Sequence, residues 1–78
     1  MKSLREEAIA QMLLSKLSEN TVTGGQTIDV AVVEGDVLLL GWCDSEEQKV
    51  TAMRIARGTY GVRGVVDNIR VRRIVQAI

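Results

Sequence analysis

The sequence predicts a small α+β domain in which two helices pack on one face of a three-stranded mixed sheet, in the order α-β-β-α-β. Two runs of alternating aliphatic residues, 28–33 and 37–42, flank a short turn with Gly35, which is typical of a β-hairpin. A helix pattern follows the hairpin, and a third alternating run follows at 65–71. The strand–helix–strand connection predicts a right-handed crossover.

The first expected element is a helix over about residues 4–17. Ser3 and Glu6 have the spacing of a capping box, which marks the start of a helix. Asn20 and the glycines after it indicate its end and a loop. Apolar side chains at helical spacing predict its buried stripe, namely Ile9, Met12, Leu13 and Leu17.

The run 37–42 is apolar on both faces of the expected strand, which is typical of a central strand. The second helix is expected to begin at a cap, Asp44 or Ser45. Its small residues permit close approach to the sheet, so we expect Ala56 to face Gly41 or its neighbours. The core is predicted to contain Leu13, Leu17, Val30, Val37, Leu39, Ile55, Ala56 and Ile69.

Length and composition indicate one folded domain with an aliphatic core. The chain has 78 residues, 46% of them apolar and 26% charged, and no Phe. We expect a single domain over residues 1–78, with a core at about 4–71 and an apolar tail at 72–78. The net charge is zero, but seven basic residues and one acid follow from position 49 onward. This basic third either meets an anionic surface or simply makes the domain dipolar.

Catalytic chemistry is not visible in the sequence. There is no His, which excludes Ser–His and Cys–His pairs and imidazole ligation of metals. Cys43 lies near a helix start, where a thiolate is stabilised, but a small residue at a strand end is the simpler interpretation. Asp44, Glu46 and Glu47 are more simply a helix cap and first turn than a calcium or acid–base site. We therefore predict no catalytic residue, no cofactor, no metal and no enzyme activity.

The glycines near position 61 match a nucleic-acid motif only in part. Gly61 and Gly64 have the G-x-x-G spacing with which KH domains clamp single-stranded RNA. In KH domains this loop joins two helices, whereas here it joins a helix to a strand. Gly58 or Gly61 is expected to end the second helix, and the pair is better interpreted as turn glycines.

Taken together, the ordered pattern resembles the BON domain family of bacterial envelope proteins. It has a spaced aliphatic strand, a turn glycine, V-x-L-x-G, a capped helix with A-x-x-I-A, then G-V-x-x-V and a closing strand. These features correspond here to Ile28, Val30, Val32, Gly35, Val37, Leu39, Gly41, Ala52, Ile55, Ala56, Gly61, Val62, Val65, Asp67, Asn68, Ile69 and Val71. The resemblance covers about residues 4–71. It implies an α-β-β-α-β fold and a non-enzymatic module that binds phospholipid membranes or envelope partners.

Two features depart from the family pattern, and one of them suggests a binding surface. The sheet face away from the helices is apolar in the second strand, and an apolar tail follows Arg73. A tryptophan beside aliphatic residues with arginines at the rim suits a lipid interface. It also suits a protein contact, because Trp and Arg are enriched in hot spots. The predicted surface comprises Leu38, Leu40, Trp42, Val66, Arg70 and Arg72.

The expected function is therefore membrane or envelope binding, with an anionic phospholipid surface or an envelope protein as partner. The alternative is a structural or oligomerisation module, with homo-oligomers, that has no lipid affinity. In another interpretation, the tail at 74–78 or a neighbouring domain covers the surface and makes it ordinary core. Nucleic-acid binding ranks below the other binding functions.

The expected location depends on whether more chain exists. No stretch reaches the ~18–20 apolar residues of a transmembrane helix. Glu6 and Glu7 interrupt the N-terminus, which does not resemble a signal peptide. We expect a cytoplasmic location if this is the full chain, and the periplasm or cell envelope if it is a domain excised from a longer secreted one.

Overall fold

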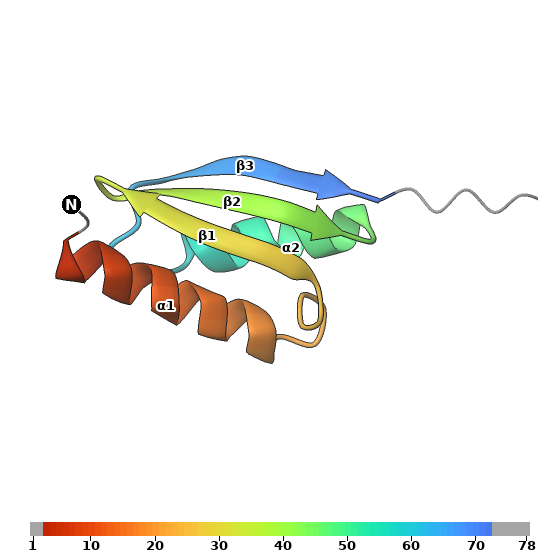
Figure 1. Cartoon of the computed structure of the whole chain (residues 1–78). Helices are drawn as coiled ribbons and strands as arrows, with labels where there is room; N and C mark the ends of the chain where they lie inside the picture. The colour runs from red at the N-terminus through yellow and green to blue at the C-terminus, as the bar shows by residue number, and fades with distance from the viewer. Residues whose placement is uncertain (1–2, 73–78) are drawn as a thin grey trace, which may run out of the picture.

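The computed structural model describes residues 3–72 and confirms the predicted α+β fold (Figure 1). Its elements follow in the predicted order, with bounds within three residues of those expected. They are α1 (Leu4–Glu19), β1 (Thr27–Val33), β2 (Asp36–Cys43), α2 (Glu46–Arg57) and β3 (Gly64–Val71). The apolar tail expected at 72–78 lies outside the described residues except for Arg72.

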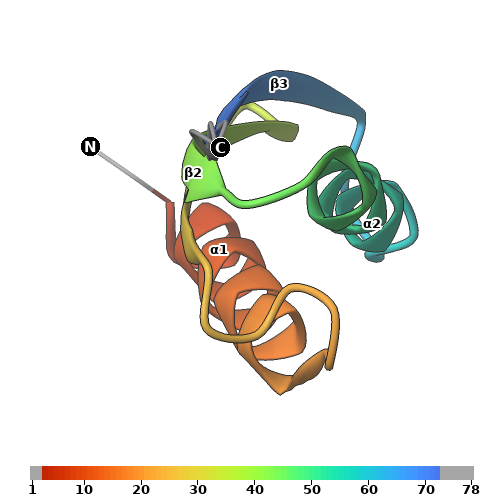
Figure 2. The ribbon, with the colours of Figure 1, turned by 90° about the vertical axis from the view of Figure 1, so that its right-hand side faces the viewer.

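The sheet has the order β1-β2-β3, which confirms β2 as the central strand. β1 and β2 are antiparallel, and β2 and β3 are parallel, as the helical crossover requires. Both helices lie on the same face of the sheet, α1 against β1 and α2 against β3 and β2 (Figures 1 and 2). The opposite face carries no helix. The domain therefore has two layers, and one sheet face has no covering element within residues 3–72.

The core lies between the helices and the sheet. Its fully buried members include Leu13, Val37, Leu39, Ala52 and Ala56. Two expectations were wrong. Met12 is 40% exposed, because the buried stripe of α1 is centred on residues 9, 13 and 17 with Ala10 beside them, and Met12 lies on its flank. Ile55 is only half-buried and packs at the margin of the core.

Both helices begin with a complete capping box. The Ser3 hydroxyl accepts the N–H of Glu6, and Ser45 does the same for Gln48. Each cap satisfies backbone donors that have no partner within the helix. Ser45, not Asp44, is therefore the second cap. α2 ends at Gly58, not at Gly61.

Two places in the sheet, the hairpin turn and one residue within β2, depend on backbone conformations with positive φ. The hairpin between β1 and β2 has φ of 52° at Glu34 and 85° at Gly35, which is the pattern of a type I′ turn. Gly41 has φ of 115°, and a Cβ there would collide with the backbone carbonyl oxygen of Thr27 in β1. The neighbouring strand β1 therefore requires a glycine at position 41, and the expectation that Ala56 faces Gly41 or its neighbours stays a prediction.

Candidate binding surface

The strand register places five of the six predicted surface residues on the sheet face away from the helices. We call this the outer face. Leu38 lies beside Ala31 and Val66 in one row, and Trp42 lies beside Thr27 and Arg70 in another. Between these rows lie Asp29, Leu40 and Asn68, and the row nearest the hairpin turn holds Val33, Asp36 and Gly64. The alternation predicted from sequence therefore brings Leu38, Leu40, Trp42, Val66 and Arg70 together.

Arg72 follows the last residue of β3. Its backbone N–H donates to the carbonyl oxygen of Cys43 at 2.7 Å, so the pairing of β3 with β2 continues to this position. Because side chains alternate along a strand, Arg72 shares the side of the sheet on which Arg70 lies. The sixth predicted residue thus lies at the end of the same face.

Apolar side chains on the outer face remain accessible. Trp42 is 44% exposed, Val66 47% and Val33 56%, while Leu38 and Leu40 are half-buried by their neighbours. Residues 74–78, which were considered as a cover for this surface, lie outside the described residues.

Arg70 and Trp42 form a defined pair. The guanidinium carbon of Arg70 lies 5.7 Å from the centroid of the Trp42 ring, within the range of a cation–π interaction. Among residues 3–72 the ion pair is Lys49–Asp67, so neither Arg70 nor Arg72 has a carboxylate partner there. We call Trp42, Arg70 and Arg72 the basic end of the outer face. Its guanidinium N–H groups are available to an external anion.

Acidic residues lie at the other end of the outer face. Asp36 follows the hairpin turn on this face, Glu34 is the first residue of the turn itself, and both are exposed. We call these two residues the acidic end. Asp29 on β1 adds a third carboxylate at the face. Sequence reasoning did not assign these acids to the surface, although the same alternation that placed the arginines could have placed Asp29 and Asp36.

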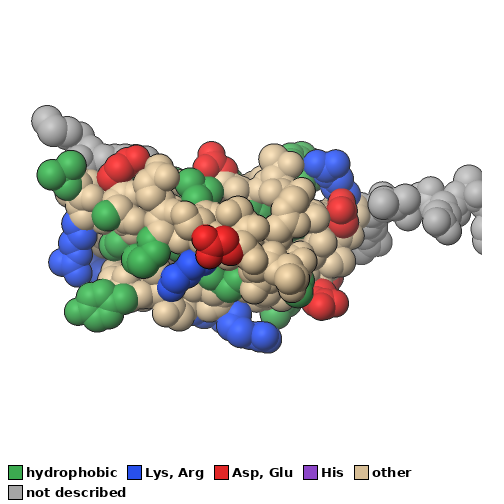
Figure 3. All heavy atoms as spheres, turned by 90° about the horizontal axis from the view of Figure 1, so that it is seen from below, with side chains coloured by type: hydrophobic (Ala, Val, Ile, Leu, Met, Phe, Trp, Pro, Cys, Tyr) green, Lys and Arg blue, Asp and Glu red, His purple; other side chains and the backbone are tan. Residues whose placement is uncertain are grey.

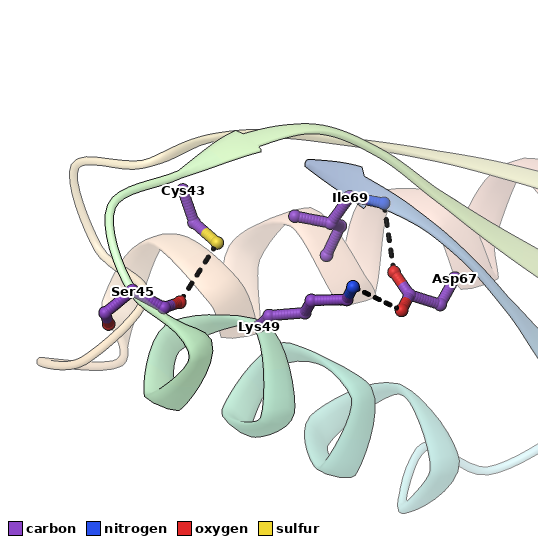
Figure 4. Close-up of polar contacts among 5 residues, drawn as sticks. All are labelled: Cys43, Ser45, Lys49, Asp67 and Ile69. Carbon is purple, nitrogen blue, oxygen red and sulfur yellow. Dashed lines mark hydrogen bonds and ion pairs between the residues drawn. The ribbon is translucent and has the colours of Figure 1, made fainter. Parts of the chain in front are cut away.

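The other chemical candidates in the sequence have structural roles. Cys43 is buried, and its thiol donates to the Ser45 carbonyl oxygen at 3.3 Å (Figure 4). Burial, the largest cause, raises the pKa of the Cys43 thiol, which keeps it protonated and poorly nucleophilic. Within residues 3–72 no three His, Cys, Asp or Glu side chains are grouped closely enough to hold a metal ion.

The G-x-x-G segment connects α2 to β3 and packs on α1. Gly61 has φ of 92°, and a Cβ there would lie 3.2 Å from the Ile9 Cδ1 atom. The N–H of Arg63 donates to the carbonyl oxygen of Gly35 at 2.8 Å, which joins this loop to the hairpin turn. The loop is thus joined to both α1 and the hairpin turn, as expected of turn glycines.

The helix layer offers a different kind of surface. Hydrophobic side chains on that side occur in separate groups between charged ones (Figure 3). A shallow depression of about 330 Å³ on α2 is lined by Val50, Met53, Arg54 and Arg57, whose i, i+3, i+4, i+7 spacing could have been read from the sequence. No helix among the described residues is long and apolar enough to cross a membrane.

The fold is a small two-layer domain with one uncovered sheet face within residues 3–72. The chain belongs to the BON domain family, whose model matches residues 5–73 and so covers almost the whole chain. BON is a binding-type domain found in envelope proteins and regarded as a membrane- and phospholipid-binding module. No curated protein matches the chain significantly.

Proposed function

We propose that this domain binds anionic phospholipid surfaces through its outer face and that the basic end makes the first contact. The observation that carries the proposal is the exposed Trp42 with Arg70 against its ring and Arg72 beside it. Tryptophan favours the interface between headgroups and acyl chains, and arginine binds phosphate through several N–H donors. Leu40 and Val66 extend the apolar part of the surface.

The area of the outer face favours a lipid surface over a stable protein interface. Three strands ~4.8 Å apart, each about eight residues long at ~3.3 Å per residue, cover roughly 350–400 Å². A stable protein–protein interface buries about 800 Å² on each partner. A patch of the estimated size is within the ~300–600 Å² of functional apolar patches on monomers. This flat footprint of the outer face therefore favours a weak protein contact over a tight dimer, whereas a bilayer sets no such minimum.

The charge distribution favours a tilted approach to the membrane. Trp42 lies six positions after Asp36 in β2, which corresponds to ~20 Å at ~3.3 Å per residue. The Debye length at physiological ionic strength is about 8 Å, so the two ends of the face are screened from each other. The acidic end is repelled by an anionic surface although the chain has zero net charge. The basic end should therefore lie closer to the bilayer than the hairpin turn.

The opposite charges at the two ends also favour a second candidate function, which is self-association. Two copies stacked face to face in opposite directions would bring the basic end of each against the acidic end of the other. The small area predicts that such a dimer is weak. In this alternative the domain is a structural or oligomerisation module that does not bind lipid.

A bacterial cell envelope is the proposed location, because membrane binding at an anionic leaflet fits the family to which the chain belongs. The proposed partners are an anionic phospholipid surface first and an envelope protein second. This location applies to the domain as part of a secreted chain.

Vesicle binding by two matched arginine variants tests the lipid proposal. Arg70→Gln and Arg57→Gln remove the same charge, one from the outer face and one from α2. Partition into phosphatidylglycerol-containing vesicles should fall about fivefold for Arg70→Gln, since each arginine near such a surface contributes ~1 kcal/mol. Arg57→Gln should change it by less than about twofold, because Arg57 ends α2 in the helix layer, on the other side of the sheet from the contact.

Three controls complete the test. Binding should weaken as salt is raised and should be lost on vesicles of phosphatidylcholine alone. Equal effects of the two variants, or no binding by the wild type, would contradict the proposal. A Trp42 emission change on concentrating the protein without vesicles would support the self-association alternative.

A further inference from the structure

A sheet of three strands leaves two free edges, one on β1 and one on β3. Free edges present backbone N–H and C=O groups that can pair with a strand of another molecule. β3 is especially suited to such pairing, because Val65, Val66, Ile69 and Val71 are β-branched. How the domain keeps these edges from pairing is a separate question from what its outer face binds.

The β3 edge is occupied at its centre by an aspartate. The Arg72 N–H points to β2, where it donates to Cys43, and successive N–H groups of a strand alternate in direction. The N–H of Ile69 therefore points away from β2, to the free edge. Asp67 Oδ1 accepts that N–H at 3.0 Å (Figure 4).

A second contact holds the Asp67 carboxylate in place. The Lys49 Nζ of α2 lies 3.0 Å from Asp67 Oδ2, so one carboxylate joins the strand edge to the helix beneath it (Figure 4). The hydrogen bond to Asp67, the largest cause, raises the pKa of the Lys49 ammonium, in agreement with this pairing. The edge N–H is thus covered by a side chain that is itself anchored.

On the β1 edge, an aspartate side chain also accepts a hydrogen bond from an outward-pointing N–H group. Val33 and Asp36 close the two-residue hairpin, so the N–H of Val33 faces β2 and alternation turns the N–H of Val30 to the free edge. Asp29 Oδ1 accepts the Val30 N–H at 2.9 Å. Near the middle of each free edge, an aspartate carboxylate therefore accepts a hydrogen bond from an N–H group that points away from the sheet.

We propose that Asp29 and Asp67 close the two edges of the sheet to strand addition, and that removing the Asp67 carboxylate makes β3 pair with the β3 of a second copy. A carboxylate accepts hydrogen bonds but donates none, and it occupies the donor that an incoming carbonyl needs. Its negative charge also repels that carbonyl. The domain is thereby restricted to contacts through its faces. This inference does not depend on lipid binding.

Two substitutions at one position separate the effects of charge and of the hydrogen bond. Asp67→Ala removes the acceptor, whereas Asp67→Asn removes the charge and keeps an acceptor oxygen for the Ile69 N–H. Both should fold, because a partly exposed ion pair contributes little to stability, and far-UV circular dichroism checks this. In sedimentation from micromolar to millimolar concentration, the wild type and Asp67→Asn should stay monomeric and Asp67→Ala should dimerise.

Amide hydrogen exchange locates the contact. As Asp67→Ala is concentrated, the outward N–H groups of Val65, Ile69 and Val71 should gain protection while Trp42 emission stays unchanged. The inference is overturned if Asp67→Ala stays monomeric, if Asp67→Asn dimerises equally well, or if protection appears on the outer face instead. Edge pairing in the wild type would overturn it as well.

Discussion

Truncating Leu39 tests the assignment of the two faces of β2. Leu39 is fully buried between the sheet and the helices, and Leu38, the preceding residue, is half-buried on the outer face. Leu39→Ala removes buried methyl groups and leaves a cavity, which costs about 2–5 kcal/mol. Leu38→Ala removes the same atoms from a surface that solvent already reaches, so we expect about 1 kcal/mol or less.

The expected difference is large on the scale of a small domain. A domain of this size has a total stability of roughly 5 kcal/mol, and each kcal/mol shifts the melting temperature by about 4–8 °C. A loss of ~3 kcal/mol therefore lowers it by about 10–25 °C. Urea unfolding followed by circular dichroism measures both variants, and Leu39→Val gives a graded point if the alanine variant is already unfolded. Equal losses for Leu38→Ala and Leu39→Ala would refute the assignment of faces.

Two other predictions concern positions with one clear physical cause each. Gly41→Ala should lose about 1–3 kcal/mol or more, because its φ is positive and a Cβ meets the Thr27 carbonyl; a neutral result in urea unfolding would contradict the collision. Burial raises the pKa of the Cys43 thiol above its ordinary value of 9.0, so the protonated thiol stabilises the fold. This stabilisation is complete below about pH 9 and is lost as the pH rises through the folded pKa. The Cys43→Ala variant should not lose stability as the pH rises through this range. If the unfolding free energies of the wild type and the variant show the same pH profile, ionisation of the Cys43 thiol does not affect stability.

Local signals made most of the fold predictable. The capping residues, the hairpin turn and the alternation of each strand depend on neighbours in sequence, and all three were confirmed. The position of β2 at the centre followed from its two apolar faces. Met12 was wrongly predicted to be buried. Helical spacing predicts an apolar stripe along α1, but it does not show which side of that stripe faces the sheet. That choice depends on how α1 sits on β1.

Contacts between strands could not be derived from the sequence. Gly41 is required by the backbone of β1, and the V-x-L-x-G pattern does not show which neighbour approaches it. Asp67 also appears as an ordinary polar residue of a strand. That β3 is an edge follows from the central position of β2, but the role of Asp67 also depends on two facts that only the structure gives. The Ile69 N–H points outward, and Lys49 lies beneath.

The sequence predicted which residues share the outer face, but not that its basic and acidic residues lie at opposite ends. Alternation placed Leu38, Leu40 and Trp42 on one face, and the register confirmed that arrangement. The separation of a basic end from an acidic end needs the pairing of β1 and β3 with β2, because residues distant in sequence share each row. The assignment of lipid as the partner remains a proposal that the arrangement supports.

Depth-dependent quenching of Trp42 in anionic vesicles tests the central claim most directly. The wild-type domain has one tryptophan, so bromine on lipid acyl chains reports on Trp42 alone. A second chain with Trp42→Phe and Val33→Trp places the single tryptophan at the other end of the outer face. The account predicts a blue shift and strong quenching for Trp42 and clearly weaker quenching at position 33. Bound protein in which Trp42 is neither shifted nor quenched would contradict it.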